Sequence, residues 1–166
     1  MIERYRRLAE RLKSELPDID REVLRAQKSW TTAQVADDAD PFIDSVALNL
    51  HGFYSGVERL LELIVTLVDE SQPDGSGWHK QLLDLVAQAV PGVRPAVLSS
   101  QSAAALDEYR KFRHLVRNVY TSRLVPARKK PLLDTLPDVW PRVQTELLTF
   151  ADFADRLSRA DEEPEA

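Results

Sequence analysis

The residues best suited to chemistry lie in the segment YRKFRHLVRNVY, from Tyr109 to Tyr120. At about 100° per residue, a helix over this segment divides into two arcs. The apolar arc holds Phe112, Leu115, Val116 and Val119. The opposite arc holds Arg110, Arg113, His114, Arg117, Asn118 and Tyr120. Such a helix would bury one side in a core and present a cationic, hydrogen-bonding side that suits a phosphate-bearing partner.

The spacing of the polar arc suggests one kind of reaction. Arg113, Arg117 and Tyr120 are four and three residues apart, so they share a face, and His114 pairs with Asn118 beside them. An arginine fork can bind a phosphate through two bonds, and a histidine can move a proton near neutral pH. Beside RNA, this set would suit metal-independent phosphodiester cleavage. The open alternative, which spacing alone slightly favours, is a set of interhelical salt bridges to acidic residues elsewhere.

The distribution of charge singles out the same part of the chain. A net charge of −5 argues against nonspecific nucleic-acid binding. However, residues 109–133 contain eight Lys or Arg and no Asp or Glu. One basic segment on an acidic body has the electrostatic footprint of a phosphate-binding surface, and the open alternative, which a charge run alone favours, is a solvated helix face. The cluster Arg128, Lys129 and Lys130, expected in a proline-flanked connection, would extend that surface, or else be an ordinary solvated loop.

Metal and membrane sites are not predicted. The chain has no cysteine, which excludes thiolate metal sites and disulfides. His51 and His79 lack the spacing of ligand pairs, so the sequence predicts neither a metal nor a cofactor. No apolar segment resembles a signal peptide or is long enough to span a bilayer, so the expected compartment is the cytoplasm.

The composition predicts an all-α fold, because glycines are few and Ala, Leu, Glu and Arg are common. We expect one domain over residues 1–160, a bundle of four to five main helices, followed by an acidic disordered tail at 161–166. Pro17 is expected to break or kink the first helix. Asp40 is the expected cap of the third segment, and Ser99 or Ser102 that of the polar helix. The expected helical ranges are 2–16, 18–35, 41–70, 78–90, 99–123 and 137–159.

The string from Phe112 to Tyr120 resembles the signature of HEPN-domain proteins, and more specifically of the HepT-like ribonuclease toxins. That signature is an arginine, four residues, a histidine, any residue and a tyrosine. Arg113 and Tyr120 match it, whereas Asn118 stands at the histidine position. The segments LNLHGFYSGVER (48–59) and WHKQLL (78–83), and the spacing from Arg94 to the motif, are also similar. The resemblance covers roughly residues 40–157.

The resemblance implies a helical homodimer in which two copies of the motif form a cleft that cuts RNA without a metal. Arg113 would bind the scissile phosphate. It also implies a partner, a minimal nucleotidyltransferase antitoxin that adds AMP to Tyr120. A phosphate-bearing adduct beside Arg113 would occupy the place of the RNA backbone.

Asn118 departs from the family pattern, because an amide cannot act as a general acid or base. It can still orient the substrate, and His114, about one turn earlier in the helix, is the expected substitute proton carrier. Three hypotheses follow. The first is a HepT-like endoribonuclease toxin. The second is a catalytically inactive HEPN-like module that binds RNA, a nucleotide or a partner, and the third is a structural adaptor.

Overall fold

The structure, a computed structural model, describes residues 2–118 and 126–160, apart from the side chains of residues 117, 118 and 126–128. Within these ranges the secondary structure is helical, with a single isolated bridge between Val90 and Arg94. The all-α prediction is therefore confirmed. The helices are α1 (Ile2–Ala33), α2 (Asp40–Val68), α3 (Trp78–Val86), α4 (Ser100–Asn118) and α5 (Pro126–Ala160).

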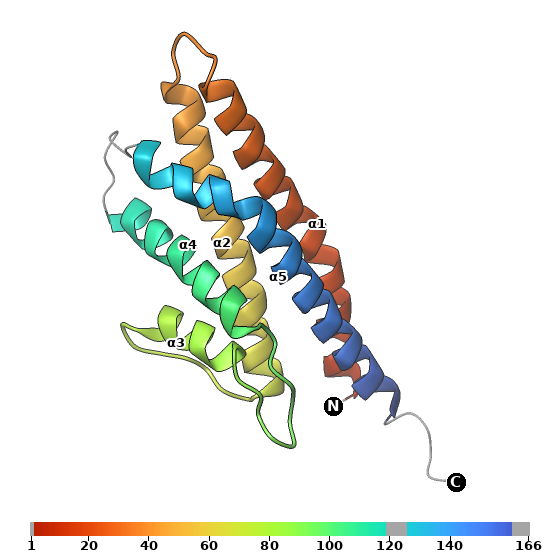
Figure 1. Cartoon of the computed structure of the whole chain (residues 1–166). Helices are drawn as coiled ribbons and strands as arrows, with labels where there is room; N and C mark the ends of the chain where they lie inside the picture. The colour runs from red at the N-terminus through yellow and green to blue at the C-terminus, as the bar shows by residue number, and fades with distance from the viewer. Residues whose placement is uncertain (1, 119–125, 161–166) are drawn as a thin grey trace.

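Three long helices form the body of the molecule (Figure 1). α1 packs along both α2 and α5, and its beginning lies at the same end of the bundle as the end of α5. α4 packs against α2 and α5, and the short α3 packs against α2 and α4. This arrangement gives α4 two covered sides, one toward α5 and the other toward α2 and α3.

The core centres on α2, whose apolar stripe is buried along most of its length. Phe53 of α2 makes edge-to-face contacts with Tyr109 of α4 and Trp140 of α5, at centroid distances of 5.3 and 5.6 Å. Such aromatic pairs add about 1 kcal/mol each beyond the area that they bury. They fix α4 and α5 relative to α2, and so fix the position of the polar segment on α4.

The prolines do not end helices where the sequence predicts. α1 continues through Pro17, and α5 begins at Pro126 and continues through three further prolines, so the expected start at Pro137 is wrong. A proline inside a helix loses one backbone hydrogen bond. Buried side chains on both sides, Leu16 and Ile19 around Pro17, offset that loss through tertiary packing. As a consequence, residues 128–130 lie in the first turns of α5 and not in a connection.

The helix starts differ in how far they match the expected caps. The Oγ of Ser99 accepts a hydrogen bond from the backbone N–H of Ser102 at 3.1 Å, so the cap of α4 is confirmed. The predicted cap of α2 is wrong, because Asp40 is already helical and Ala39 occupies the cap position. The Asp38 carboxylate accepts from the Asp40 N–H there, at 3.1 Å.

A buried arginine joins the ends of α2 and α3. Nε and Nη2 of Arg94 donate to the two oxygens of Asp69 at 2.6 and 2.7 Å. Its Nη1 and Nη2 also donate to backbone carbonyl oxygens, those of Leu85, Gln88 and Pro95. The Arg94 side chain is completely buried. The pairing is stable nevertheless, because the guanidinium contacts both carboxylate oxygens and each of its N–H groups has an acceptor. The contact holds α3 against the end of α2.

Two glycines on α2 provide a test of how closely α1 and α2 pack. A Cβ at Gly56 would lie 2.9 Å from Cγ1 of Ile19, whereas one at Gly52 would meet the flexible carboxylate of Glu22 at 3.0 Å. Gly56→Ala is therefore expected to lower the free energy of unfolding by about 1–3 kcal/mol. Gly52→Ala should leave it unchanged or raise it by up to about 1 kcal/mol through helix propensity. Urea denaturation of both variants measures the difference, and shifts of the same sign and size would contradict the close approach at Gly56.

Candidate functional site

A buried carboxylate joins α2, α3 and α4. Glu58 of α2 is only 4% exposed. Its Oε1 accepts a hydrogen bond from Nη1 of Arg113 on α4 at 2.8 Å. Its Oε2 lies 2.9 Å from Nδ1 of His79, in the first turn of α3. One carboxylate therefore brings the motif arginine and a histidine to the same place.

The chemistry of this contact fixes which atoms donate and which accept. An ionised carboxylate that is removed from water costs several kcal/mol unless it is paired and hydrogen-bonded. The Arg113 guanidinium supplies the opposite charge, and Glu58 then acts only as an acceptor. The Nδ1 of His79 must therefore carry the proton in this contact, which leaves the lone pair of a neutral imidazole on Nε2.

The ring of His79 is also held from one side. Its centroid lies 3.7 Å from that of the Trp78 ring, with 30° between the planes. The side chain of His79 is 27% exposed, so part of the imidazole reaches solvent while Nδ1 faces Glu58. A hydrogen bond at one edge and a stacked ring on one face restrict the imidazole to one orientation.

The cluster contains two polar atoms that are not satisfied. The Tyr54 hydroxyl and the Nε of Arg113 are buried and make no hydrogen bond of normal geometry among the described residues, although the Tyr54 hydroxyl lies near the Glu58 carboxylate. Burial, together with the negative charge of Glu58, raises the pKa of Tyr54 above its ordinary value. Unsatisfied buried polar atoms are rare in folded proteins and often mark functional sites. Arg113 thus keeps donor capacity beyond its bond to Glu58.

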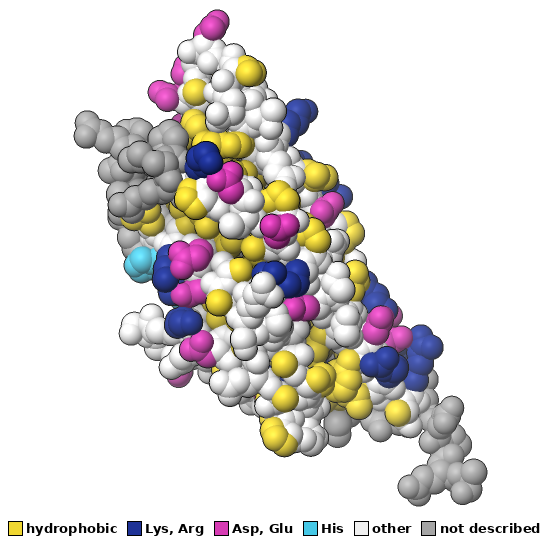
Figure 2. All heavy atoms as spheres, viewed as in Figure 1, with side chains coloured by type: hydrophobic (Ala, Val, Ile, Leu, Met, Phe, Trp, Pro, Cys, Tyr) yellow, Lys and Arg dark blue, Asp and Glu magenta, His cyan; other side chains and the backbone are white. Residues whose placement is uncertain are grey.

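The other described Lys and Arg side chains of the segment form ion pairs with acids of α4 itself. Arg110 donates to Asp107 at 2.6 Å and Lys111 to Glu108 at 3.1 Å, both one turn earlier in α4. Figure 2 accordingly shows Lys and Arg side chains interspersed with Asp and Glu over the visible face, without a continuous basic patch. Among these described cations, the interhelical salt bridge that spacing left open is present for Arg113, whereas Arg110 and Lys111 pair with acids of α4 itself.

Residues 128–130 of α5 do not form one exposed cluster. Lys129 is fully buried, unlike the surface position expected for it. Burial lowers the pKa of its ammonium group, while the charge of Asp44 acts in the opposite direction. Lys130 is exposed and donates to Asp134 at 2.8 Å. The physical reason for the difference is the helix, which turns successive residues to different sides.

Four residues singled out from the sequence are not described in full. Arg117 and Asn118 belong to the last turn of α4, but their side chains lie outside the described part of the structure. The same holds for the side chain of Arg128 in the first turn of α5. Tyr120 falls wholly outside the described residues.

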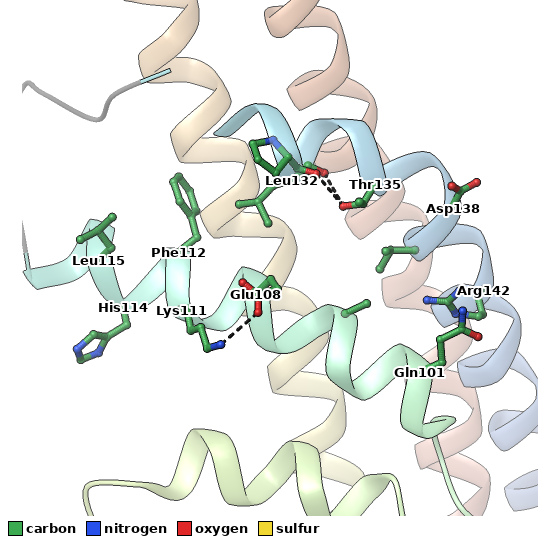
Figure 3. Close-up of a pocket in the computed structure, with 13 residues that line it drawn as sticks. Gln101, Glu108, Lys111, Phe112, His114, Leu115, Leu132, Thr135, Asp138 and Arg142 are labelled. Atoms are coloured by element: carbon green, nitrogen blue, oxygen red, sulfur yellow. Dashed lines mark hydrogen bonds and ion pairs between the residues drawn. The ribbon is translucent and has the colours of Figure 1, made fainter. Parts of the chain in front are cut away.

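His114 lies on another side of α4 from Arg113. It helps to line a groove of about 1080 Å³ between α4 and α5, whose lining includes Phe112 and Leu115 but not Arg113. Figure 3 shows Phe112 and Leu115 directed toward α5, whereas His114 leaves α4 in another direction, at the edge of the groove. The structure therefore associates Arg113 with His79 and places His114 beside the α4–α5 groove.

A family model described as HepT-like protein matches residues 45–154. The chain belongs to the HepT-like family. The match covers most of the chain and includes α3, α4, Glu58 and Arg113. Membership in the HepT-like family points to a ribonuclease module of a toxin–antitoxin pair, with a nucleotidyltransferase antitoxin as the implied partner. No curated protein and no solved structure matches this HepT-like chain.

Two further properties concern the described part of this HepT-like chain. Among its described residues, no group of three or more His, Cys, Asp or Glu side chains is placed to hold a metal ion. None of its described helices is both long enough and apolar enough to cross a bilayer.

Sequence reasoning did not identify Glu58 and His79 as parts of this HepT-like site. A signal for Glu58 exists, because it interrupts the apolar stripe of α2 beside Val57 and Leu60, where a buried acid requires a cation. No local pattern pairs it with His79, 21 residues away, or with Arg113, 55 residues away.

Two buried tyrosines form a matched pair that tests the unsatisfied hydroxyl. The Tyr109 hydroxyl donates to the carbonyl oxygen of Leu132 at 2.8 Å, whereas that of Tyr54 has no partner among the described residues. Tyr109→Phe should lower the free energy of unfolding by about 1 kcal/mol, and Tyr54→Phe should leave it unchanged or raise it by about 1 kcal/mol. Chemical denaturation at pH 7 measures both. A clear loss of stability in Tyr54→Phe would show that its hydroxyl is bonded.

Proposed function

We propose that this HepT-like protein is a metal-independent endoribonuclease, the toxin component of a toxin–antitoxin pair, blocked when AMP is added to Tyr120. Family membership supports the general activity. The observation that carries the proposal is the Glu58 carboxylate, which holds the Arg113 guanidinium and the His79 imidazole together.

Arg113 is the proposed phosphate-binding group. Glu58 engages only Nη1 of Arg113, and the Nε of this arginine has no partner among the described residues. The Arg113 side chain is 15% exposed, and its terminal N–H groups that Glu58 does not engage can bond the phosphate oxygens and stabilise the negative charge that grows on phosphorus as the bond breaks. Glu58 restricts the conformations of the Arg113 side chain, so this side chain loses less conformational entropy when RNA binds.

Other residues of the segment have supporting roles in this proposal. Asn118 orients the substrate through hydrogen bonds, because its amide cannot transfer a proton. Arg110, Arg117 and Lys130 contact the RNA backbone, and Arg128 extends the same path. Lys129 is left out of this role because it is buried. Proton transfer then requires one of two histidines, His114 or His79.

The proposed active form is a homodimer, as the family implies. The α4–α5 groove, with apolar side chains such as Phe112, Leu115 and Leu132 in its lining, is the surface that we assign to the second copy. Covering such a groove would remove apolar surface from water, which favours association.

The proposed modification at Tyr120 is supported by the burial of the other tyrosines. The chain has four tyrosines. Tyr5, Tyr54 and Tyr109 are all buried in the core. A modifying enzyme needs an accessible hydroxyl, so these three are poor acceptors in the folded protein. Tyr120 is the remaining candidate.

Cleavage of end-labelled RNA in EDTA tests the ribonuclease proposal. The purified chain, shown by mass to carry no adduct, is expected to cut RNA, and Arg113→Lys should be about 100-fold slower. Lysine keeps a positive charge near Glu58 but loses the guanidinium fork, so the fold is less at risk than in Arg113→Ala. Arg159→Lys is the matched control, since Arg159 is exposed and pairs with Asp155 at 2.8 Å.

The outcomes separate the two functions considered for this chain. Cleavage by the native chain and Arg159→Lys, but not by Arg113→Lys, supports the enzyme. No cleavage by an adduct-free native dimer, confirmed by light scattering, rules out the enzyme. Salt-sensitive RNA binding that Arg113→Lys weakens would then identify the inactive binding module.

Modification provides an independent test of the partner. Incubation with ATP, Mg²⁺ and the minimal nucleotidyltransferase expected from the same operon should add AMP to the chain and stop RNA cleavage. Tyr120→Phe should remain unmodified, whereas Tyr5→Phe should be modified like the native chain, because Tyr5 is buried. Peptide mass spectrometry locates the group. An adduct on another residue would contradict the assignment of Tyr120.

A further inference from the structure

RNA cleavage through the 2′-hydroxyl needs a group that removes a proton, and the motif position that would supply it holds Asn118. The candidates in the described part of α3 and α4 are His79 and His114. The two lie in different surroundings, so the structure distinguishes them.

His79 shares a carboxylate with the proposed phosphate-binding residue. Nδ1 of His79 and Nη1 of Arg113 each lie within 3 Å of an oxygen of Glu58. A phosphate bound by Arg113 would therefore lie near the His79 ring. His114, in contrast, lines the groove between α4 and α5, whose lining does not include Arg113 (Figure 3).

The orientation of His79 also suits a general base. Glu58 occupies Nδ1, so the lone pair of the neutral ring is on Nε2, at the opposite edge of the imidazole. The Trp78 ring restricts rotation, and 27% of the side chain remains exposed. A carboxylate that fixes the tautomer and orientation of a histidine is a common device for acid–base catalysis.

We propose that His79 is the general base of the reaction and that Glu58 is the positioning residue that holds it beside Arg113. This inference rests on the ribonuclease function proposed above. Nε2 of His79 takes the proton of the 2′-hydroxyl, and the 2′-oxygen forms a bond to phosphorus. The bond from phosphorus to the 5′-oxygen breaks, and that oxygen takes a proton from water. The imidazolium returns its proton to the resulting hydroxide, and the products are a 2′,3′-cyclic phosphate and a 5′-hydroxyl.

His79→Asn separates a catalytic role from a structural one. The asparagine amide can donate to Glu58 in place of Nδ1, but it has no counterpart of Nε2. Cleavage of end-labelled RNA should fall about 100-fold or more, the usual contribution of a general base. RNA affinity and the melting temperature should stay close to those of the native chain. Cleavage by His79→Ala should recover in part when imidazole is added.

The other histidines serve as comparisons. His114→Asn tests the other candidate and is expected to retain more cleavage than His79→Asn, and His51→Asn, which changes the third histidine of the chain, should behave like the native protein. Native-like cleavage by His79→Asn would overturn the inference while leaving the ribonuclease function intact. Loss of cleavage in His114→Asn alone would assign proton transfer to His114. Absence of cleavage in the adduct-free native chain would overturn both the inference and the function.

Discussion

The Glu58 carboxylate lies almost wholly buried where α2, α3 and α4 meet, and its charge has to be compensated inside the fold. Arg113 provides the opposite charge and His79 the second hydrogen bond, at 2.8 and 2.9 Å. Breaking a buried pair of this kind typically costs about 3–5 kcal/mol, because a charge is left without a partner. The same contact that holds the three helices together therefore positions the groups that we propose for catalysis.

Pairing with acids also limits how strongly the cations of the chain attract a polyanion. Arg110 and Lys111 are paired with acids one turn earlier on α4, and Lys129 is buried. A net charge of −5 and this local pairing leave little general attraction for a polyanion. Recognition of RNA would then depend on a few fixed donors, with Arg113 first among them, rather than on a broad basic surface.

α4 connects two environments with different physical character. Toward α2 and α3 it contributes Arg113 to a polar, partly unsatisfied cluster that includes the Tyr54 hydroxyl. Toward α5 it contributes Phe112 and Leu115 to an apolar groove. The edge-to-face contacts of Phe53 and the hydrogen bond from Tyr109 to α5 hold the helix between them. A shift of α4 would therefore change both the polar cluster and the apolar groove.

The sequence by itself determined the helical class, the stripe of α2, the polar arc of α4 and the family resemblance, because helical periodicity and short motifs are local properties of the chain. It also limited the cap of α4 to Ser99 or Ser102, and the hydrogen bond from the Ser102 N–H to the Oγ of Ser99 decided between them. Only the tertiary structure decided that helices continue through Pro17 and Pro137, since burial elsewhere offsets the lost hydrogen bonds. Likewise, the partners of Glu58 are 21 and 55 residues away in the chain. Glu58, His79 and Arg113 come into contact only because α2, α3 and α4 pack together. The residue spacing within a single helix carries no information about contacts between helices.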